Sequence, residues 1–106
     1  MAADAYGLVY APIVQRHLAK IERKYHSSVR RAITQQLRFE PERETKNRKP
    51  LQRPTVLGAV WELRCGSDNP FRVFYRTDGD ARQVHVLAIG VKIKDRLVVG
   101  GEEFDL

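Results

Sequence analysis

The residues of this chain that could carry out chemistry are its arginines and lysines. Between Lys46 and Arg53, the stretch "KNRKPLQR" carries four cationic side chains and no acidic one. Three arginines follow at positions expected to lie on strands: Arg64, Arg72 and Arg76. A guanidinium group can bind two phosphate oxygens at once and stays protonated. The pattern therefore predicts a surface that binds a polyanion. For the stretch 44–54, a connector kept soluble by its charge is the alternative.

Length and composition limit the class of protein. The chain has 106 residues, 42% hydrophobic and 30% charged, which is typical of one globular domain spanning residues 1–106. Its net charge of +6 favours contact with nucleic acid, anionic lipid or an acidic protein. The one cysteine and three histidines show no metal-ligand spacing, so we expect no metal and no cofactor. Because we find neither a signal peptide nor a long apolar run, we expect a cytoplasmic protein with no membrane partner.

Hydrophobic periodicity predicts the elements that position the cations. Apolar residues follow a strand pattern at 6–10, a helical pattern at 12–25 and 28–39, and strand patterns at 59–64, 71–76 and 82–90. The turn "TDGDA" between the last two predicts a hairpin. This order predicts an α+β domain in which a two-helix hairpin packs on one face of an antiparallel sheet.

Alternation along the strands predicts which sheet face carries the arginines. In "FRVFYR" the apolar residues at alternate positions would face the helices, so that Arg72 and Arg76 lie on the opposite face. Arg64 in "AVWELR" falls on that same face, in the strand that the stretch 44–54 leads into. We therefore expect a concave cationic surface on the face that the helices leave open.

Several short strings carry a resemblance to a known family. They are "RFEPERETKNRKPL", "WELR", "FRVFY", "VLAIGVK" and the closing "GGEE". In order and spacing they resemble the RelE/ParE superfamily of toxins from bacterial type II toxin–antitoxin systems, over roughly Tyr6 to Glu103. The resemblance implies a RelE-like β-α-α-β-β-β fold.

The resemblance also implies a function and partners. RelE-type members are endoribonucleases that cut mRNA in the ribosomal A site, which would make the ribosome and mRNA partners of this chain. ParE-type members share the fold but inhibit DNA gyrase without nuclease chemistry. Both are silenced by a cognate antitoxin, here expected to be acidic and encoded adjacently. A third reading is a degenerate toxin that acts only with its antitoxin in promoter binding.

For the nuclease reading, the family pattern implies three catalytic residues. Arg72 matches the strand arginine directed at the scissile phosphate, Arg64 matches a common family position, and Lys92 follows the last strand where a basic residue is usual. Cleavage without a metal uses the 2′-hydroxyl as nucleophile, and it needs a base, an acid and cations. A lysine could act as the base where neighbouring cations lower its pKa.

The remaining cations are predicted to bind RNA backbone phosphates without regard to sequence. They are Lys46, Arg48, Lys49, Arg53, Arg76 and Lys94.

Two considerations bear on the nuclease reading. RelE-type nucleases resemble one another in a tyrosine beyond the last strand, whereas "KIKDRLVVGGEEF" has none. The reading also requires Arg64 and Arg72 to converge on one open pocket. If they point apart, or form carboxylate pairs below the surface, this argues against nuclease activity.

Overall fold

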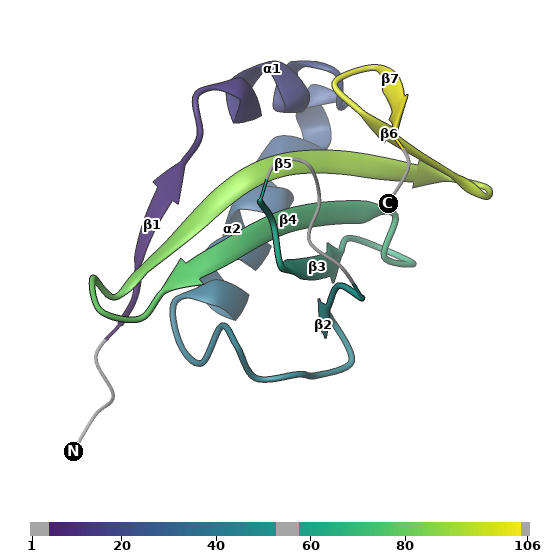
Figure 1. The fold of residues 1–106 in the computed structure, drawn as a ribbon. Coiled ribbons are helices and arrows are strands. Elements are labelled where there is room, and N and C mark those ends of the chain that lie inside the picture. Colours follow the sequence, from purple (N-terminus) through teal and green to yellow (C-terminus); the bar gives the residue numbers. More distant parts are fainter. Residues whose placement is uncertain (1–4, 53–57, 105–106) are drawn as a thin grey trace.

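The computed structural model describes residues 5–52 and 58–104, which form one sheet and two α-helices (Figure 1). The elements in chain order are β1 (Gly7–Tyr10), α1 (Ile13–Ala19), a 3-10 turn η1 (Arg23–Tyr25), α2 (His26–Leu37), β2 (Arg48–Pro50), β3 (Trp61–Cys65), β4 (Phe71–Asp78), β5 (Gln83–Ile93), β6 (Arg96–Val99) and β7 (Glu102–Phe104). The predicted α+β class, with an antiparallel sheet and two helices, is confirmed.

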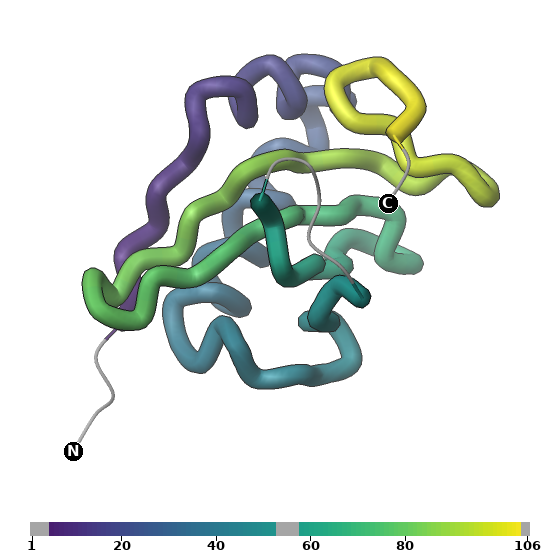
Figure 2. The backbone as a smooth tube through the Cα atoms, in the orientation of Figure 1, coloured from purple at the N-terminus to yellow at the C-terminus, as the bar shows by residue number. Residues whose placement is uncertain are grey.

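The sheet is built around the long strand β5. Strands β2 to β7 pair antiparallel in chain order. The first half of β5 also pairs with β1, in parallel, and its second half pairs with β6. In Figure 2 the chain of β1 runs beside β5 before it turns into the helices. A parallel pair needs a long crossover between its strands, and the helices and β2–β4 provide it.

Three strands are additional to the predicted order. β2 lies in the stretch expected to be a connector, and β6 and β7 form a hairpin beyond the last predicted strand. The hairpin turn is Gly100–Gly101, and both residues have positive φ, +63° and +85°. Glycine adopts this geometry without steric cost, which suits a two-residue hairpin loop.

The main core lies between the helices and one face of the sheet. Apolar side chains of α1 and α2, among them Val14, Ile33 and Leu37, pack with Val73 and Tyr75 of β4. The Tyr75 hydroxyl, buried there, donates a hydrogen bond to the Pro41 carbonyl at 2.7 Å. The apolar faces of the two helices thus cover the sheet face that alternation along β4 predicted to be apolar.

The close helix hairpin that we expected is not confirmed. The first helix ends at Ala19, short of the predicted 12–25, and an extended residue, Glu22, separates it from η1. As a result, α1 lies mainly against β5 and α2 against β3. Within the described ranges, neither helix is long and apolar enough to cross a bilayer.

The opposite sheet face is less open than predicted. A second apolar cluster buries Phe74 with Ala59, Ala88 and Val99. Leu97 and Phe104 of the β6–β7 hairpin pack against this cluster. The hairpin therefore covers part of the face, and the polar part of the face remains accessible beside it.

Candidate functional site

A polar cavity of about 280 Å³ opens on the face that carries the arginines. Its walls come from β3, β4, β5 and the β6–β7 region: Glu62, Arg64, Arg72, Lys92, Asp95, Leu97 and Phe104. The strand register explains this convergence, because Arg64 lies opposite Arg72 and Arg72 lies opposite Gly90. Lys92 is two residues further along β5, on the same face. The three residues predicted to be catalytic thus line one cavity, and their catalytic role stays a prediction.

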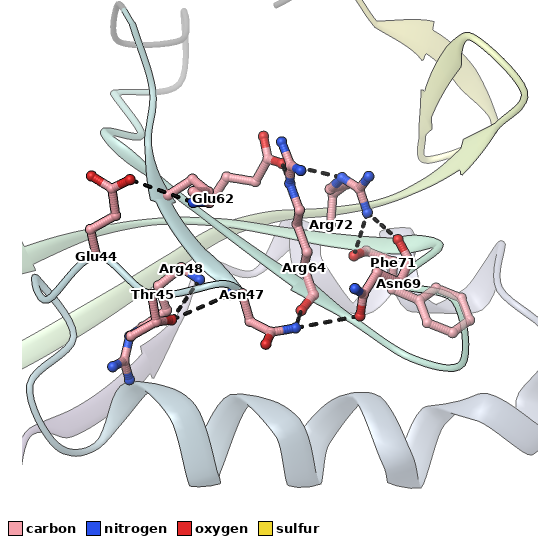
Figure 3. Close-up of polar contacts among 10 residues, drawn as sticks. Glu44, Thr45, Asn47, Arg48, Glu62, Arg64, Asn69, Phe71 and Arg72 are labelled. Carbon is pink, nitrogen blue, oxygen red and sulfur yellow. Dashed lines mark hydrogen bonds and ion pairs between the residues drawn. The ribbon is translucent and has the colours of Figure 1, made fainter.

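Arg64 and Arg72 are held together by one carboxylate. Two like charges directly opposite each other on adjacent strands are unfavourable. Here Glu62 Oε1 lies 2.8 Å from Nε of Arg64 and 3.2 Å from Nε of Arg72. Figure 3 shows the three side chains directed toward one another. The arginines therefore converge, as the nuclease reading requires, but they also form the carboxylate pairs that argue against it.

Burial distinguishes the two arginines. The side chain of Arg64 is 43% exposed, whereas that of Arg72 is 11% exposed. The Nη1 atom of Arg72 also donates hydrogen bonds to the backbone carbonyls of Asn69 and Phe71. Burial lowers the pKa of Arg72 from its ordinary value, while the Glu62 carboxylate raises it and the Arg64 charge lowers it further. Arg64 is the more accessible cation, and Arg72 is anchored behind it.

The far wall of the cavity depends on close packing of β6 against β5. A Cβ atom at Gly90 would lie 2.8 Å from Val99 Cγ2 and 2.9 Å from the Val98 carbonyl oxygen. Glycine at this position therefore allows the β6–β7 hairpin to approach. Leu97 and Phe104 are opposite each other on that hairpin, and Leu97 is opposite Lys92. An aromatic ring thus lies in the same cavity as the cations.

The structure places Arg48, which we predicted to bind RNA, inside the fold and not at the candidate site; its RNA-binding role stays a prediction. Arg48 lies in β2, is 8% exposed, and is directed away from Glu62 (Figure 3). Its Nη1 donates to the Gln36 carbonyl at 2.5 Å, and its Nε donates to the Arg43 carbonyl at 3.0 Å. It therefore satisfies a carbonyl in the last turn of α2, a group left without an intrahelical partner. Because side chains alternate along β2, Arg48 points inward and its neighbour Lys49 points outward.

The other predicted RNA-binding cations lie on several different elements. Lys49 is opposite Glu62 in the sheet register, and its Nζ lies 3.5 Å from Glu44 Oε2. Lys46 is exposed just before β2, and Lys94 is exposed in the β5–β6 turn that follows Lys92. Arg76 is exposed near the other end of β4, opposite His85. Arg53 lies outside the described residues.

Sequence reasoning did not assign a functional role to Glu62, Asp95 or Phe104. For Glu62 a signal existed, because its alternation with Arg64 in "WELR" places both side chains on one face. Phe104 could not be found that way, since its place depends on the β6–β7 hairpin. Among residues 5–52 and 58–104, no group of three His, Cys, Asp or Glu residues could hold a metal ion.

Comparison with known families places the chain in one of them. Residues 19–97 match the Gp49-like family of phage-derived proteins (DUF891), which covers most of the chain, and the chain belongs to this family. The Gp49-like family is associated with RelE-like toxins of toxin–antitoxin modules. No match was found among curated proteins.

Proposed function

We propose that this protein is the toxin of a toxin–antitoxin module and that it cuts mRNA on the ribosome without a metal ion. The convergence of Arg64, Arg72 and Lys92 on one cavity is the observation that carries the proposal. Membership of the Gp49-like family supports the toxin assignment. The partners that follow are an acidic antitoxin encoded next to the gene, the ribosome and mRNA.

The cavity offers groups for cleavage by the 2′-hydroxyl of RNA. In this reaction the 2′-oxygen forms a bond to phosphorus, the bond to the 5′-oxygen breaks, and a 2′,3′-cyclic phosphate results. Arg64 and Arg72 would bind the nonbridging oxygens and stabilise the extra negative charge of the transition state. Lys92, exposed at the edge of the cavity, would donate the proton that the departing 5′-oxygen needs.

Glu62 supplies the base in this scheme. Its carboxylate occupies the position between the two guanidinium groups that a phosphate would take. When a phosphate displaces it, the carboxylate stays in the same cavity and can accept the proton of the 2′-hydroxyl. Phe104 offers a ring on which a neighbouring base can stack.

The same ion pairs favour a second candidate function. Arg72 is held by a carboxylate and two backbone carbonyls, which is the environment of a residue that supports the sheet. On this reading the protein is a toxin without nuclease activity. It would act by binding its target, as ParE-type toxins bind gyrase, or only together with its antitoxin.

Primer extension on mRNA from a purified translation system tests the proposal. We expect cuts at A-site codons, weakened about 100-fold in Arg64→Ala and in Arg72→Lys. Arg31→Ala is the matched control, because Arg31 is exposed on α2 and its loss removes the same charge. Intact mRNA from a folded, growth-arresting protein overturns the nuclease proposal. Inhibited supercoiling by that protein would then identify gyrase as the target.

A further inference from the structure

A second cavity, of about 340 Å³, lies on the helix side of the same end of the sheet. Its walls are mainly apolar and include Ile21, Tyr25, Pro70, Phe71, Val91 and Ile93. Val91 and Ile93 alternate with Lys92 along β5, so they face the other way from the candidate site. We call this the rear cavity.

One loop forms a wall of the rear cavity and also anchors the cations of the candidate site. The 66–70 loop joins β3 to β4, and Pro70 lines the rear cavity. On its other side, the carbonyl of Asn69 accepts a hydrogen bond from Arg72 Nη1. The Pro70 carbonyl accepts one from the Lys92 backbone N–H at 2.7 Å. The position of this loop therefore fixes both Arg72 and Lys92.

The loop adopts a backbone that most residues avoid. Asp68 and Asn69 have positive φ, +64° and +53°, and Gly66 has φ +90°. A Cβ atom at Gly66 would lie 2.6 Å from Cδ2 of Phe71, so the loop is packed closely against that ring. Aspartate and asparagine tolerate this region better than other residues, but it remains sparsely populated. Contacts from outside the loop can therefore change how firmly it is held.

The mouth of the rear cavity presents apolar groups beside cations. Ile93 is 54% exposed and Tyr25 is 37% exposed, and the Tyr25 ring packs on Phe71 at 5.3 Å between centroids. Lys20 and Glu22 line the helix side of the cavity, and Lys24 lies beside them, with its Nζ 3.7 Å from the Glu22 carboxylate and 5.1 Å from the centroid of the Tyr25 ring. An apolar mouth with more cations than anions beside it fits an acidic polypeptide with apolar side chains better than it fits RNA.

We propose that the rear cavity accepts an apolar side chain of an acidic partner polypeptide, and that the filled cavity keeps Arg72 paired with Glu62. When a phosphate displaces the Glu62 carboxylate, the guanidinium of Arg72 has to turn from Glu62 toward the phosphate, and Arg72 is bonded to the 66–70 loop. A side chain seated against Pro70 and Phe71 opposes movement of that loop. The partner would thus inhibit the site from behind, without entering it. Only this inhibitory consequence rests on the proposed function.

Titration of the ¹⁵N-labelled protein with an acidic amphipathic peptide of glutamate and leucine tests the binding step. We expect amide shifts at Ser67, Phe71 and Ile93, and about tenfold weaker binding to Ile93→Asp. Val9→Asp is the matched control, because Val9 is exposed on β1 at the opposite end of β5 and gains the same charge. A peptide with serine in place of leucine should bind about tenfold more weakly to the unmutated protein.

The outcomes separate the two proposals. Equal affinity for Ile93→Asp and Val9→Asp, or for the serine peptide, overturns the assignment of the rear cavity. Weaker binding of a single-stranded RNA oligonucleotide to Ile93→Asp than to Val9→Asp, with no such difference for the peptide, overturns it in favour of RNA. If the leucine peptide binds as expected but leaves the RNA affinity unchanged, the inhibitory coupling is wrong. If the protein binds the peptide and never binds or cuts RNA, the proposed function fails while the rear cavity assignment stands.

Discussion

Glu62 and Arg72 form an ion pair below the surface of the sheet. Oε1 of Glu62 lies 3.2 Å from Nε of Arg72, and the two side chains are only 8% and 11% exposed. Removing two charges from water offsets most of the attraction between them. The value of such a pair is therefore mainly that it fixes positions: it keeps two arginines of adjacent strands at one point of the sheet.

Replacing Glu62 with glutamine should separate binding from cleavage. The Glu62→Gln variant leaves Arg72 buried without its anion, and we expect it to lose about 3 kcal/mol of unfolding free energy. In this variant no carboxylate of the protein competes with a phosphate for the two arginines. Single-stranded RNA should therefore bind about fivefold more tightly. Cleavage should fall, because the base is missing. Urea unfolding, fluorescence anisotropy and primer extension measure these three quantities.

A matched change at an exposed carboxylate controls for charge alone. Glu103→Gln removes the same charge from β7, where Glu103 is 61% exposed and pairs with Arg96. We expect little change in stability there. Weaker RNA binding by Glu62→Gln than by Glu103→Gln would contradict a phosphate site between the arginines.

Arg48 and Lys49 are neighbours whose substitutions should have opposite effects. Arg48→Ala removes two hydrogen bonds from a buried guanidinium to backbone carbonyls, and we expect a loss of about 2 kcal/mol in unfolding free energy. Lys49→Ala breaks only a partly exposed ion pair and should change stability by less than about 0.5 kcal/mol.

The same two substitutions should affect RNA binding in the opposite order, with the larger effect at Lys49. Lys49→Ala should reduce the slope of log affinity against log salt by about one, since one phosphate contact is lost. Folded Arg48→Ala should keep the slope of the unmutated protein. Chemical denaturation and salt titrations of RNA binding provide the measurements. An unchanged slope in Lys49→Ala would remove Lys49 from the RNA-binding surface.

His17 should make the protein less stable at acidic pH. Its Nδ1 accepts a hydrogen bond from the Ile89 backbone N–H at 3.1 Å, and burial lowers its pKa. A histidine in the unfolded chain has a pKa of about 6.5. As the pH falls through this value, the unfolded state takes up the proton first, so stability is complete above about pH 6.5 and decreases below it.

Urea unfolding at about pH 7 and about pH 5 measures this effect. The loss of stability between the two should be smaller in His17→Gln, whose amide oxygen can accept the same hydrogen bond. His85→Gln is the control, because His85 lies on β5 with an intermediate exposure. An identical pH dependence in His17→Gln and the unmutated protein would rule out His17 as the source.

Cys65 should react slowly with thiol reagents while the protein is folded. Burial raises the pKa of its thiol to about 11, with the Arg72 charge acting in the opposite direction. The thiolate is the reactive form, so very little of it is present near neutral pH. We expect the reaction with Ellman's reagent to be slow in buffer and fast in concentrated urea. Rapid labelling in buffer would show that β3 opens without global unfolding.

Local patterns predicted the elements with long apolar periodicity. The strands expected at 59–64, 71–76 and 82–90 correspond to β3, β4 and β5, because alternation over several residues is a strong signal. The short strands β2, β6 and β7 lack that signal: β2 contains Pro50, and β7 is "EEF". Such strands form because a neighbouring edge is free to pair, which is a tertiary property.

The candidate site was partly predictable for the same reason. Alternation placed Arg64 and Arg72 on one face, and the register brought them opposite each other. The role of Arg48 could not be read from its basic neighbourhood, because it depends on a carbonyl at the end of α2. The sequence therefore showed which residues are charged. It did not show which of these charges remain accessible, because that depends on how distant segments pack.

The parallel pair of β1 and β5 has a consequence for how the chain is made. Gly7 lies next to Gln83, so the first strand finds its neighbour only after most of the polypeptide has been synthesised. Contacts this distant in sequence form slowly, since a long loop must close first. A nascent chain would therefore leave β1 unpaired until residues 83–86 of β5 have been synthesised. A protein that binds the nascent chain through β1 has that interval in which to do so.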